Sequence, residues 1–293
     1  MKEFIKDSYK YFKTIIFGSR LSYKIIFMHI IYNVIFIIKN FFKKKNLSLK
    51  VNDYLKNFLD KGYFKLENAI PDTLLNTLHS RFLELIKNEK YLDANSAKNI
   101  LRIKDCLIHI PEAKKILDQK EIKDFLSNYF KGEFKIYYCD IHRLYKEKNS
   151  NQKIDNSSLE WHFDNCPKRL IKLMIYLADV TKENAAISLL NKKLSLKLKL
   201  KGYWDRKTQR NKSIISKYDI DNQAEFIEGR KKSGVFFSTH YCLHRANVPI
   251  NDNVFRDSVV FLIGPSLTSY DSQINIENDR ILSDIENFSL KPF

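Results

Sequence analysis

Apolar residues follow a helical period in the first half of the chain. Between about residue 52 and residue 130 they recur at helical spacing, which predicts helices from about 52 to Gly62, after Pro71, and over about 112–130. The helix after Pro71 carries its apolar residues on one face, namely Leu74, Leu75, Leu78, Phe82 and Leu85. A short strand over 63–66 follows the turn at Gly62.

From residue 133 onward, short apolar and β-branched segments replace the helical pattern. They predict strands over 133–146, 170–178, 185–190, 234–239 and 255–263. Helices followed by strands are typical of an α+β chain, here with a β-sandwich or jelly roll in its C-terminal half. Residues 191–222 form a polar, basic insertion between two of these strands.

One apolar run lies outside this pattern, at residues 25–38. It is shorter than the roughly 20 residues that a membrane-spanning helix needs, and His29 and Asn33 interrupt it. Lys24, Lys39 and the lysines at 43–45 flank the run, which favours a helix lying on an anionic membrane surface. A helix packed on the globular body and a spanning helix are the alternatives.

Charge is concentrated in two segments of a chain whose formal net charge is +17. Residues 1–50 hold eleven Lys and Arg against two acidic residues, and residues 191–217 hold ten against one. Two basic segments indicate an anionic partner surface, with a merely solvated basic face as the alternative. No nucleic-acid recognition motif supports a nucleic-acid partner. We expect a membrane-associating segment at 1–50 and a catalytic domain at 51–293.

The four cysteines stand at 106, 139, 166 and 242, and none forms a C-x-x-C pair. This spacing excludes zinc-finger and dithiol motifs and is compatible with a reducing cytoplasm. We therefore expect a cytoplasmic protein, peripheral on the inner face of the membrane.

The segment Trp161-His162-Phe163-Asp164 holds the candidate metal chemistry. His and Asp two residues apart point the same way on a strand, but not on a helix. A second His from a distant strand would complete the facial triad of non-haem iron(II) sites, which leaves three coordination positions open.

The second His is His240 or His244. His244 is favoured because it lies 12 residues before Arg256, which begins a predicted strand. The guanidinium of Arg256 suits the far carboxylate of 2-oxoglutarate, and Ser258, two residues on, shares its face and can donate to the same group. We expect no catalytic side chain beyond the three metal ligands. Lys172 and Tyr176 share the polar face of a later strand and could face either the site or solvent.

These segments together resemble the phytanoyl-CoA dioxygenase-like family of Fe(II)/2-oxoglutarate-dependent oxygenases. The resemblance rests on WHFD, on IKLMIYLADVTKENAAI, on GVFFSTHYCLHRAN and on FRDSVV, within residues 161–263. It implies a double-stranded β-helix (jelly roll, cupin-like) core with N-terminal helices. It also implies Fe(II), with 2-oxoglutarate and O2 as co-substrates. His162, Asp164 and His244 then become the metal ligands and Arg256 the co-substrate anchor.

The chain departs from the family pattern around the substrate pocket. Ala185 stands where the family turn has Gly, 191–194 replace a P-G-S-H segment, and Val235 replaces an acidic residue. The expected activity is hydroxylation of an unactivated C–H bond. The expected substrate is a lipid-linked or lipopolysaccharide sugar, as in the similar Kdo hydroxylases. The alternatives are a soluble acyl or small-metabolite substrate, or a non-catalytic jelly-roll binding module.

Overall fold

The computed structural model describes residues 48–94, 99–146, 157–164, 169–203 and 214–266, together with residues 31, 34, 35, 37 and 38. The longer helices in this part of the chain are α3 (Leu49–Lys61), α4 (Asp72–Leu85), α5 (Lys120–Phe130) and α6 (Lys192–Leu200). Residues 214–217 are also helical, and α8 (Ile220–Gln223) is a single turn. Short 3-10 helices cover Glu89–Tyr91, Cys106–Ile108, Pro111–Ile116 and Ser157–Leu159. The strands are β1 (Tyr63–Leu66), β2 (Ile100–Ile103), β3 (Phe134–Tyr145), β4 (Ile171–Tyr176), β5 (Ser188–Leu189), β6 (Glu225–Phe226), β7 (Gly234–Phe237), β8 (His244–Arg245) and β9 (Phe255–Pro265).

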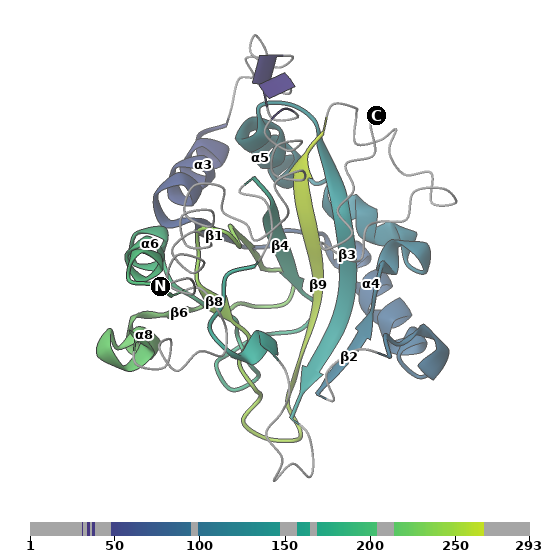
Figure 1. Ribbon diagram of the computed structural model, residues 1–293. Coiled ribbons are helices and arrows are strands. Elements are labelled where there is room, and N and C mark those ends of the chain that lie inside the picture. Colours follow the sequence, from purple (N-terminus) through teal and green to yellow (C-terminus); the bar gives the residue numbers. More distant parts are fainter. Residues whose placement is uncertain are drawn as a thin grey trace.

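The strands form a large and a small antiparallel sheet. The large sheet has the order β1-β7-β4-β9-β3-β2, and the small sheet has the order β6-β5-β8. The long strands β3 and β9 pair from Phe134 with Pro265 to Tyr145 with Phe255 and run through the middle of the molecule (Figure 1). The chain is therefore an α+β protein, with α3, α4 and α5 before the long strands, as the sequence predicts.

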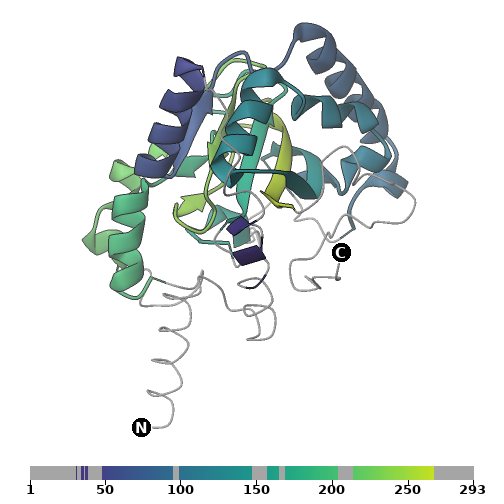
Figure 2. The same cartoon turned by 90° about the horizontal axis from the view of Figure 1, so that it is seen from above.

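The two faces of the large sheet have different roles. The outer face carries Leu173, Phe236 and Phe261, which pack in one hydrophobic cluster with buried residues of α3, α4 and α5. Figure 2 shows these helices gathered on one side of the large sheet. The inner face contributes Met174, Val235 and Val260 to a second cluster with residues of the small sheet. We call this second side of the large sheet the inner face.

Local sequence accounts for the first helix and strand. The Ser48 side chain accepts a hydrogen bond from the Val51 N–H and caps the start of α3. Gly62 ends the helix with φ 85°, a left-handed conformation that glycine adopts without a Cβ penalty. The predicted helix, turn and strand over 52–66 are thereby confirmed.

Two predicted elements differ from the structure. The helix expected over 112–130 is divided into a 3-10 helix over Pro111–Ile116 and α5, because Gln119 adopts an extended conformation before α5 begins. Both pieces bury apolar residues in the same cluster, so tertiary packing outweighs local helix propensity here. The strand expected over 185–190 is confined to Ser188–Leu189, because Ala185 has φ 71° and cannot continue a strand.

The basic insertion at 191–222 lies between β5 and β6, as predicted, but its described residues are not a plain polar loop. It forms α6 and α8 and contributes Leu198, Tyr203 and Ile220 to a third hydrophobic cluster, around Trp161. Residues 204–213 of the insertion lie outside the described part.

Most of the apolar run at 25–38 also lies outside the described residues. Its five described residues are helical and exposed, from 39% for Ile31 to 68% for Ile38. Ile31, Val34, Ile35 and Ile38 are spaced to share one helix face. Among the described residues no helix has the length and apolarity required to cross a membrane.

Candidate metal and co-substrate site

His162, Asp164 and His244 come together as a group that can hold a metal ion. Oδ1 of Asp164 lies 3.5 Å from Nε2 of His162 and 3.6 Å from Nε2 of His244. A metal bonded to all three at 2.0–2.2 Å with right angles between bonds would place them about 3 Å apart, so the group needs to close only slightly. His240, the alternative distal histidine, is not part of this group.

Backbone pairing brings the two histidines together. His162 and His244 exchange N–H···O bonds of 2.9 and 3.0 Å in an isolated antiparallel bridge, so their side chains emerge on the same side. The Asp164 N–H donates to the Thr239 carbonyl, which continues the extended path. The expectation that His162 and Asp164 share one side of an extended segment is correct, although the segment is a bridge rather than a regular strand.

The outer nitrogen of each imidazole fixes its tautomer. Nδ1 of His162 lies 2.7 Å from the Glu160 carbonyl oxygen, and Nδ1 of His244 lies 3.0 Å from the Cys242 carbonyl oxygen. A carbonyl only accepts, so each Nδ1 carries the proton and each Nε2 keeps its lone pair toward the centre of the group. Nε2 of His244 is buried and makes no hydrogen bond among the described residues. This orphaned buried atom fits a metal ligand.

The two oxygens of Asp164 face different partners. Oδ1 faces the histidines, whereas Oδ2 lies 2.6 Å from Nζ of Lys172 on β4. Burial alone would raise the pKa of Asp164, but the charge of Lys172 outweighs burial and holds that pKa well below its usual range. The carboxylate is therefore ionised, with one oxygen held by Lys172 and the other directed at the candidate metal position.

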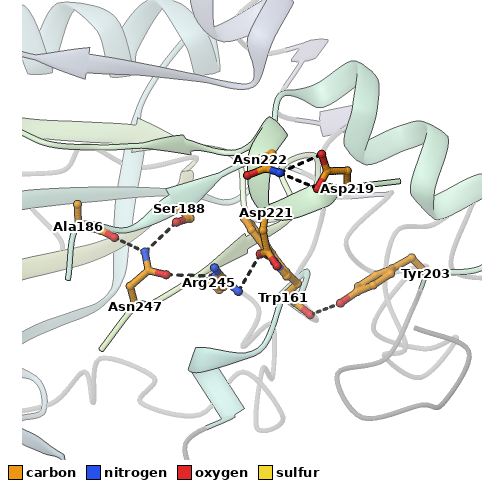
Figure 3. A network of polar contacts seen from close by, with 9 residues as sticks. All are labelled: Trp161, Ala186, Ser188, Tyr203, Asp219, Asp221, Asn222, Arg245 and Asn247. Atoms are coloured by element: carbon orange, nitrogen blue, oxygen red, sulfur yellow. Dashed lines mark hydrogen bonds and ion pairs between the residues drawn. The ribbon is translucent and has the colours of Figure 1, made fainter. Parts of the chain in front are cut away.

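A polar network supports both histidines from their neighbours in the chain (Figure 3). The Asp221 carboxylate binds both the Trp161 indole N–H and the Arg245 guanidinium, each at 2.9 Å. Tyr203 donates to the Trp161 carbonyl, and Asn247 accepts from Arg245 while donating to Ser188 on β5. The network thus ties 161 to 245, the residues directly beside His162 and His244, through the insertion that carries Tyr203 and Asp221.

Arg256 and Ser258 lie side by side on the inner face, as their spacing on β9 predicts. Arg256 is buried with 3% of its surface exposed, and it donates from Nη1 to the Ala185 carbonyl. Its Nε is buried and has no hydrogen-bond partner among the described residues. A buried cation with an unused donor fits a carboxylate ligand, because that ligand would supply both the missing acceptor and the missing charge.

His142 is a third polar residue beside Arg256 and Ser258, and no motif around it in the sequence predicts this position. It pairs across the strands with Ser258, whose hydroxyl lies 3.2 Å from Nε2 of His142. Burial and the charges of Arg256 and Arg102 lower the pKa of His142 to about 3, so the ring is neutral at physiological pH. Only the register of β3 against β9, which cannot be read from single residues, places it beside Arg256.

The strand register also shows where Arg256 lies relative to the metal group. Residues paired across antiparallel strands project to the same face. Lys172 pairs with Leu262 of β9, six residues from Arg256 along the strand. Lys172 contacts Asp164, so the metal group and Arg256 lie over the same face of the sheet. Of the two orientations open to Lys172 from sequence, the structure supports the one toward the site.

Comparisons with known proteins show the fold. No protein-family model matches the sequence, and no curated protein matches it. Among solved structures, the non-heme alpha ketoglutarate dependent carbocyclase SnoK from nogalamycin biosynthesis is 15% identical, with a TM-score of 0.53, 75% of this chain covered and 84% of that one. HygX from Streptomyces hygroscopicus, solved with nickel, 2-oxoglutarate and hygromycin B, is 10% identical with a TM-score of 0.54, covering 76% and 89%. EctD from S. alaskensis, solved with bound Fe, is 15% identical with a TM-score of 0.57, covering 78% and 82%. The chain shares its fold with these three proteins.

Proposed function

We propose that this chain is an Fe(II)- and 2-oxoglutarate-dependent oxygenase. The single observation that carries the proposal is the convergence of two lone-pair nitrogens and one carboxylate oxygen, from His162, His244 and Asp164, over the face that bears Arg256. Two nitrogens and one oxygen on one side of a metal are the donor set of non-haem iron oxygenases. A structural zinc site would use a fourth protein ligand.

The comparisons support the cofactor assignment. HygX was solved with nickel and 2-oxoglutarate, and EctD was solved with iron and, separately, with 2-oxoglutarate and 5-hydroxyectoine. In this chain, Arg256 and Ser258 would bind the far carboxylate of 2-oxoglutarate. We also propose that the large and small sheets are the two halves of a jelly roll, as in the phytanoyl-CoA dioxygenase-like family.

The reaction we propose is hydroxylation. Bound Fe(II) supplies the redox chemistry: O2 and 2-oxoglutarate give succinate and CO2, with one oxygen atom in succinate and the other inserted into a substrate C–H bond. Asp164 keeps a carboxylate where related halogenases have a small residue, which favours hydroxylation over halogenation. The neutral His142 accepts or donates at Ser258 without adding charge beside Arg256.

Conversion of 2-oxoglutarate tests this proposal. Purified protein reloaded with Fe(II) should form succinate at a rate that depends on both O2 and 2-oxoglutarate, even without a primary substrate. Protein treated with a chelator and reloaded with Mg²⁺ serves as the control. Succinate formation in the Mg²⁺-loaded control at the same rate, or none with Fe(II), would refute the proposal.

We further propose that the N-terminal apolar face docks on an anionic membrane, so that a lipid-linked substrate reaches the site. The support is the exposed stripe of Ile31, Val34, Ile35 and Ile38 beside Lys39 and the lysines at 43–45. Each lysine near an anionic leaflet contributes about 1 kcal/mol. Full-length protein should sediment with anionic vesicles at low salt, and a chain starting at Asn46 should not. Equal sedimentation of the two proteins, or none of either, would contradict docking.

A further inference from the structure

The inner face continues beyond the metal and Arg256 positions onto β3 and β2. Across β4, β9 and β3, Lys172, Leu262 and Tyr138 form one row, and Met174, Val260 and Asp140 form the next. In the following row, Tyr176, Ser258 and His142 are joined by Arg102 of β2. Tyr138 and Asp140 therefore project to the side that carries Lys172 and Ser258.

These two side chains lie within reach of a molecule held at the metal. Neighbouring strands are about 4.8 Å apart, and two residues along a strand advance about 6.8 Å. Asp140 on β3 is thus about 12 Å, backbone to backbone, from Lys172 on β4. That separation matches one ring-sized group plus the two side chains that would contact it.

Tyr138 and Asp140 are desolvated but, like Arg102, retain accessible surface. All three are partly exposed. Even so, burial raises the pKa of Tyr138, and burial raises the pKa of Asp140 although the charges of Arg102, Lys104 and Lys172 act against it. Lys172 is hydrogen-bonded to Tyr138, and the Asp105 N–H donates to Asp140, so the Tyr138 hydroxyl can still donate and the Asp140 carboxylate can still accept from a ligand.

The charges around Asp140 restrict the ligand. Arg102 donates from Nε and Nη2 to Asp93, and Lys104 lies 3.5 Å from the same carboxylate, so these cations are already largely neutralised. An anionic ligand would gain little from them and would meet Asp140. A cationic ligand would gain little from Asp140, because the charges of Arg102, Lys104 and Lys172 already act on that carboxylate. An acyl chain would place apolar atoms against the polar atoms of Tyr138 and Asp140 and give them no hydrogen bond.

Hydroxyl groups can bind both the Tyr138 hydroxyl and the Asp140 carboxylate, because each hydroxyl donates one hydrogen bond and accepts others. The Asp105 N–H donates to Oδ1 of Asp140 at 3.2 Å and fixes the plane of the carboxylate. We infer that Asp140 and Tyr138 form the substrate subsite, and that it takes a hydroxyl-rich carbohydrate or polyol group. This inference rests on the proposed oxygenase function and names its substrate class.

The test uses Fe(II)-loaded full-length protein and five probes: methyl α-glucoside and methyl α-mannoside, against serine, lysine and octanoate. The two sugars should stimulate succinate formation and raise the melting temperature, and the other three should not. Asp140→Asn should lower the sugar-dependent kcat/KM about tenfold or more, because a hydrogen bond to a charged acceptor is lost. Tyr138→Phe should lower it by a smaller factor. Asp118→Asn, at an exposed site, is the matched control and should change nothing.

The outcomes separate the two proposals. Binding of Fe(II) and 2-oxoglutarate by Asp140→Asn shows that this variant is folded. If succinate forms but the sugars neither stimulate it nor shift melting, the subsite inference is wrong and the oxygenase proposal stands. If no succinate forms, the oxygenase proposal fails, and the subsite is judged by melting alone: a sugar shift that Asp140→Asn abolishes supports it, and no shift, or an unchanged one, overturns it.

Discussion

At the residue scale, Lys172 determines which carboxylate oxygen of Asp164 is available to a metal. The amine of Lys172 contacts Oδ2 of Asp164, so Oδ1 remains beside the two imidazoles. This arrangement favours coordination of the metal through a single carboxylate oxygen. Groups that orient a metal ligand in this way are typically worth 10- to 100-fold in metal affinity.

Lys172→Met should therefore weaken Fe(II) binding about 10- to 100-fold, as measured by equilibrium dialysis. Lys172→Arg retains the charge and should recover part of the loss. Lys50→Met, which removes an exposed lysine paired with Glu121, is the control and should bind Fe(II) normally. Equal affinity in Lys172→Met and Lys50→Met would show that Lys172 does not orient the carboxylate.

Arg256 should affect the co-substrate and not the metal. Arg256→Ala leaves the far carboxylate of 2-oxoglutarate without its cation, at a cost of about 2 kcal/mol or more. The Kd for 2-oxoglutarate should therefore rise about 30-fold or more in calorimetric titrations, with Fe(II) stoichiometry unchanged. A Kd for 2-oxoglutarate within twofold of the original would assign the anchor to another residue.

At the element scale, the turn before β5 contains a residue in a strained backbone conformation. Ala185 has φ 71°, a left-handed conformation that costs a residue with a Cβ about 1–2 kcal/mol, and glycine would avoid that cost. Its carbonyl accepts from Arg256, so the conformation is tied to the site.

Ala185→Gly should raise the free energy of unfolding by up to about 1 kcal/mol, because relief of this strain exceeds the added freedom of the unfolded chain. Ala186→Gly, at a buried neighbour without positive φ, should lower it. Urea denaturation measures both. A destabilised Ala185→Gly would mean that the turn is not strained.

Helix α4 is joined to the sheet through a buried carboxylate on the outer face. Arg143 of β3 donates to both oxygens of Asp257, at 2.8 and 2.7 Å, and His79 of α4 lies 3.0 Å from Oδ2. Burial alone would raise the pKa of Asp257, but Arg143 and His79 outweigh it and lower that pKa.

The stability from this depressed pKa is present above the ordinary aspartate pKa of about 4 and is lost as pH falls through the lower native value. Asp257→Asn should cost about 3 kcal/mol at pH 7, because it leaves Arg143 without its partner. It should also flatten the decline of melting temperature below about pH 5. An unchanged melting curve at both pH 7 and pH 4 would contradict this role.

The sequence contains the local signals but not the pairing between distant segments. The helix–turn–strand over 52–66 follows from Gly62, and the positions of His162, Asp164, Arg256 and Ser258 follow from spacing within extended segments. His142 and Lys172 join the site, and Asp140 the proposed subsite, only through strand register, which no short pattern determines. The break before α5 likewise arises from shared packing of its two pieces, not from a local breaker.

At the scale of the whole molecule, the two faces of the large sheet have different roles. Helices cover the outer face and pack against it in one hydrophobic cluster, so the inner face is available for polar residues. The insertion at 191–222 adds the network that supports His162 and His244 through their neighbours. The most basic internal segment of the chain therefore also contributes residues that support the metal group.

The proposed function depends on iron binding by His162, Asp164 and His244. The most direct measurement is Fe(II) stoichiometry after anaerobic dialysis, for the unmodified chain, His162→Ala, His244→Ala and the control His240→Ala. We predict one Fe(II) per chain for the unmodified protein and for His240→Ala, and no stoichiometric Fe(II) for the other two. Full occupancy in His162→Ala or His244→Ala, or loss of iron in His240→Ala alone, would contradict the account.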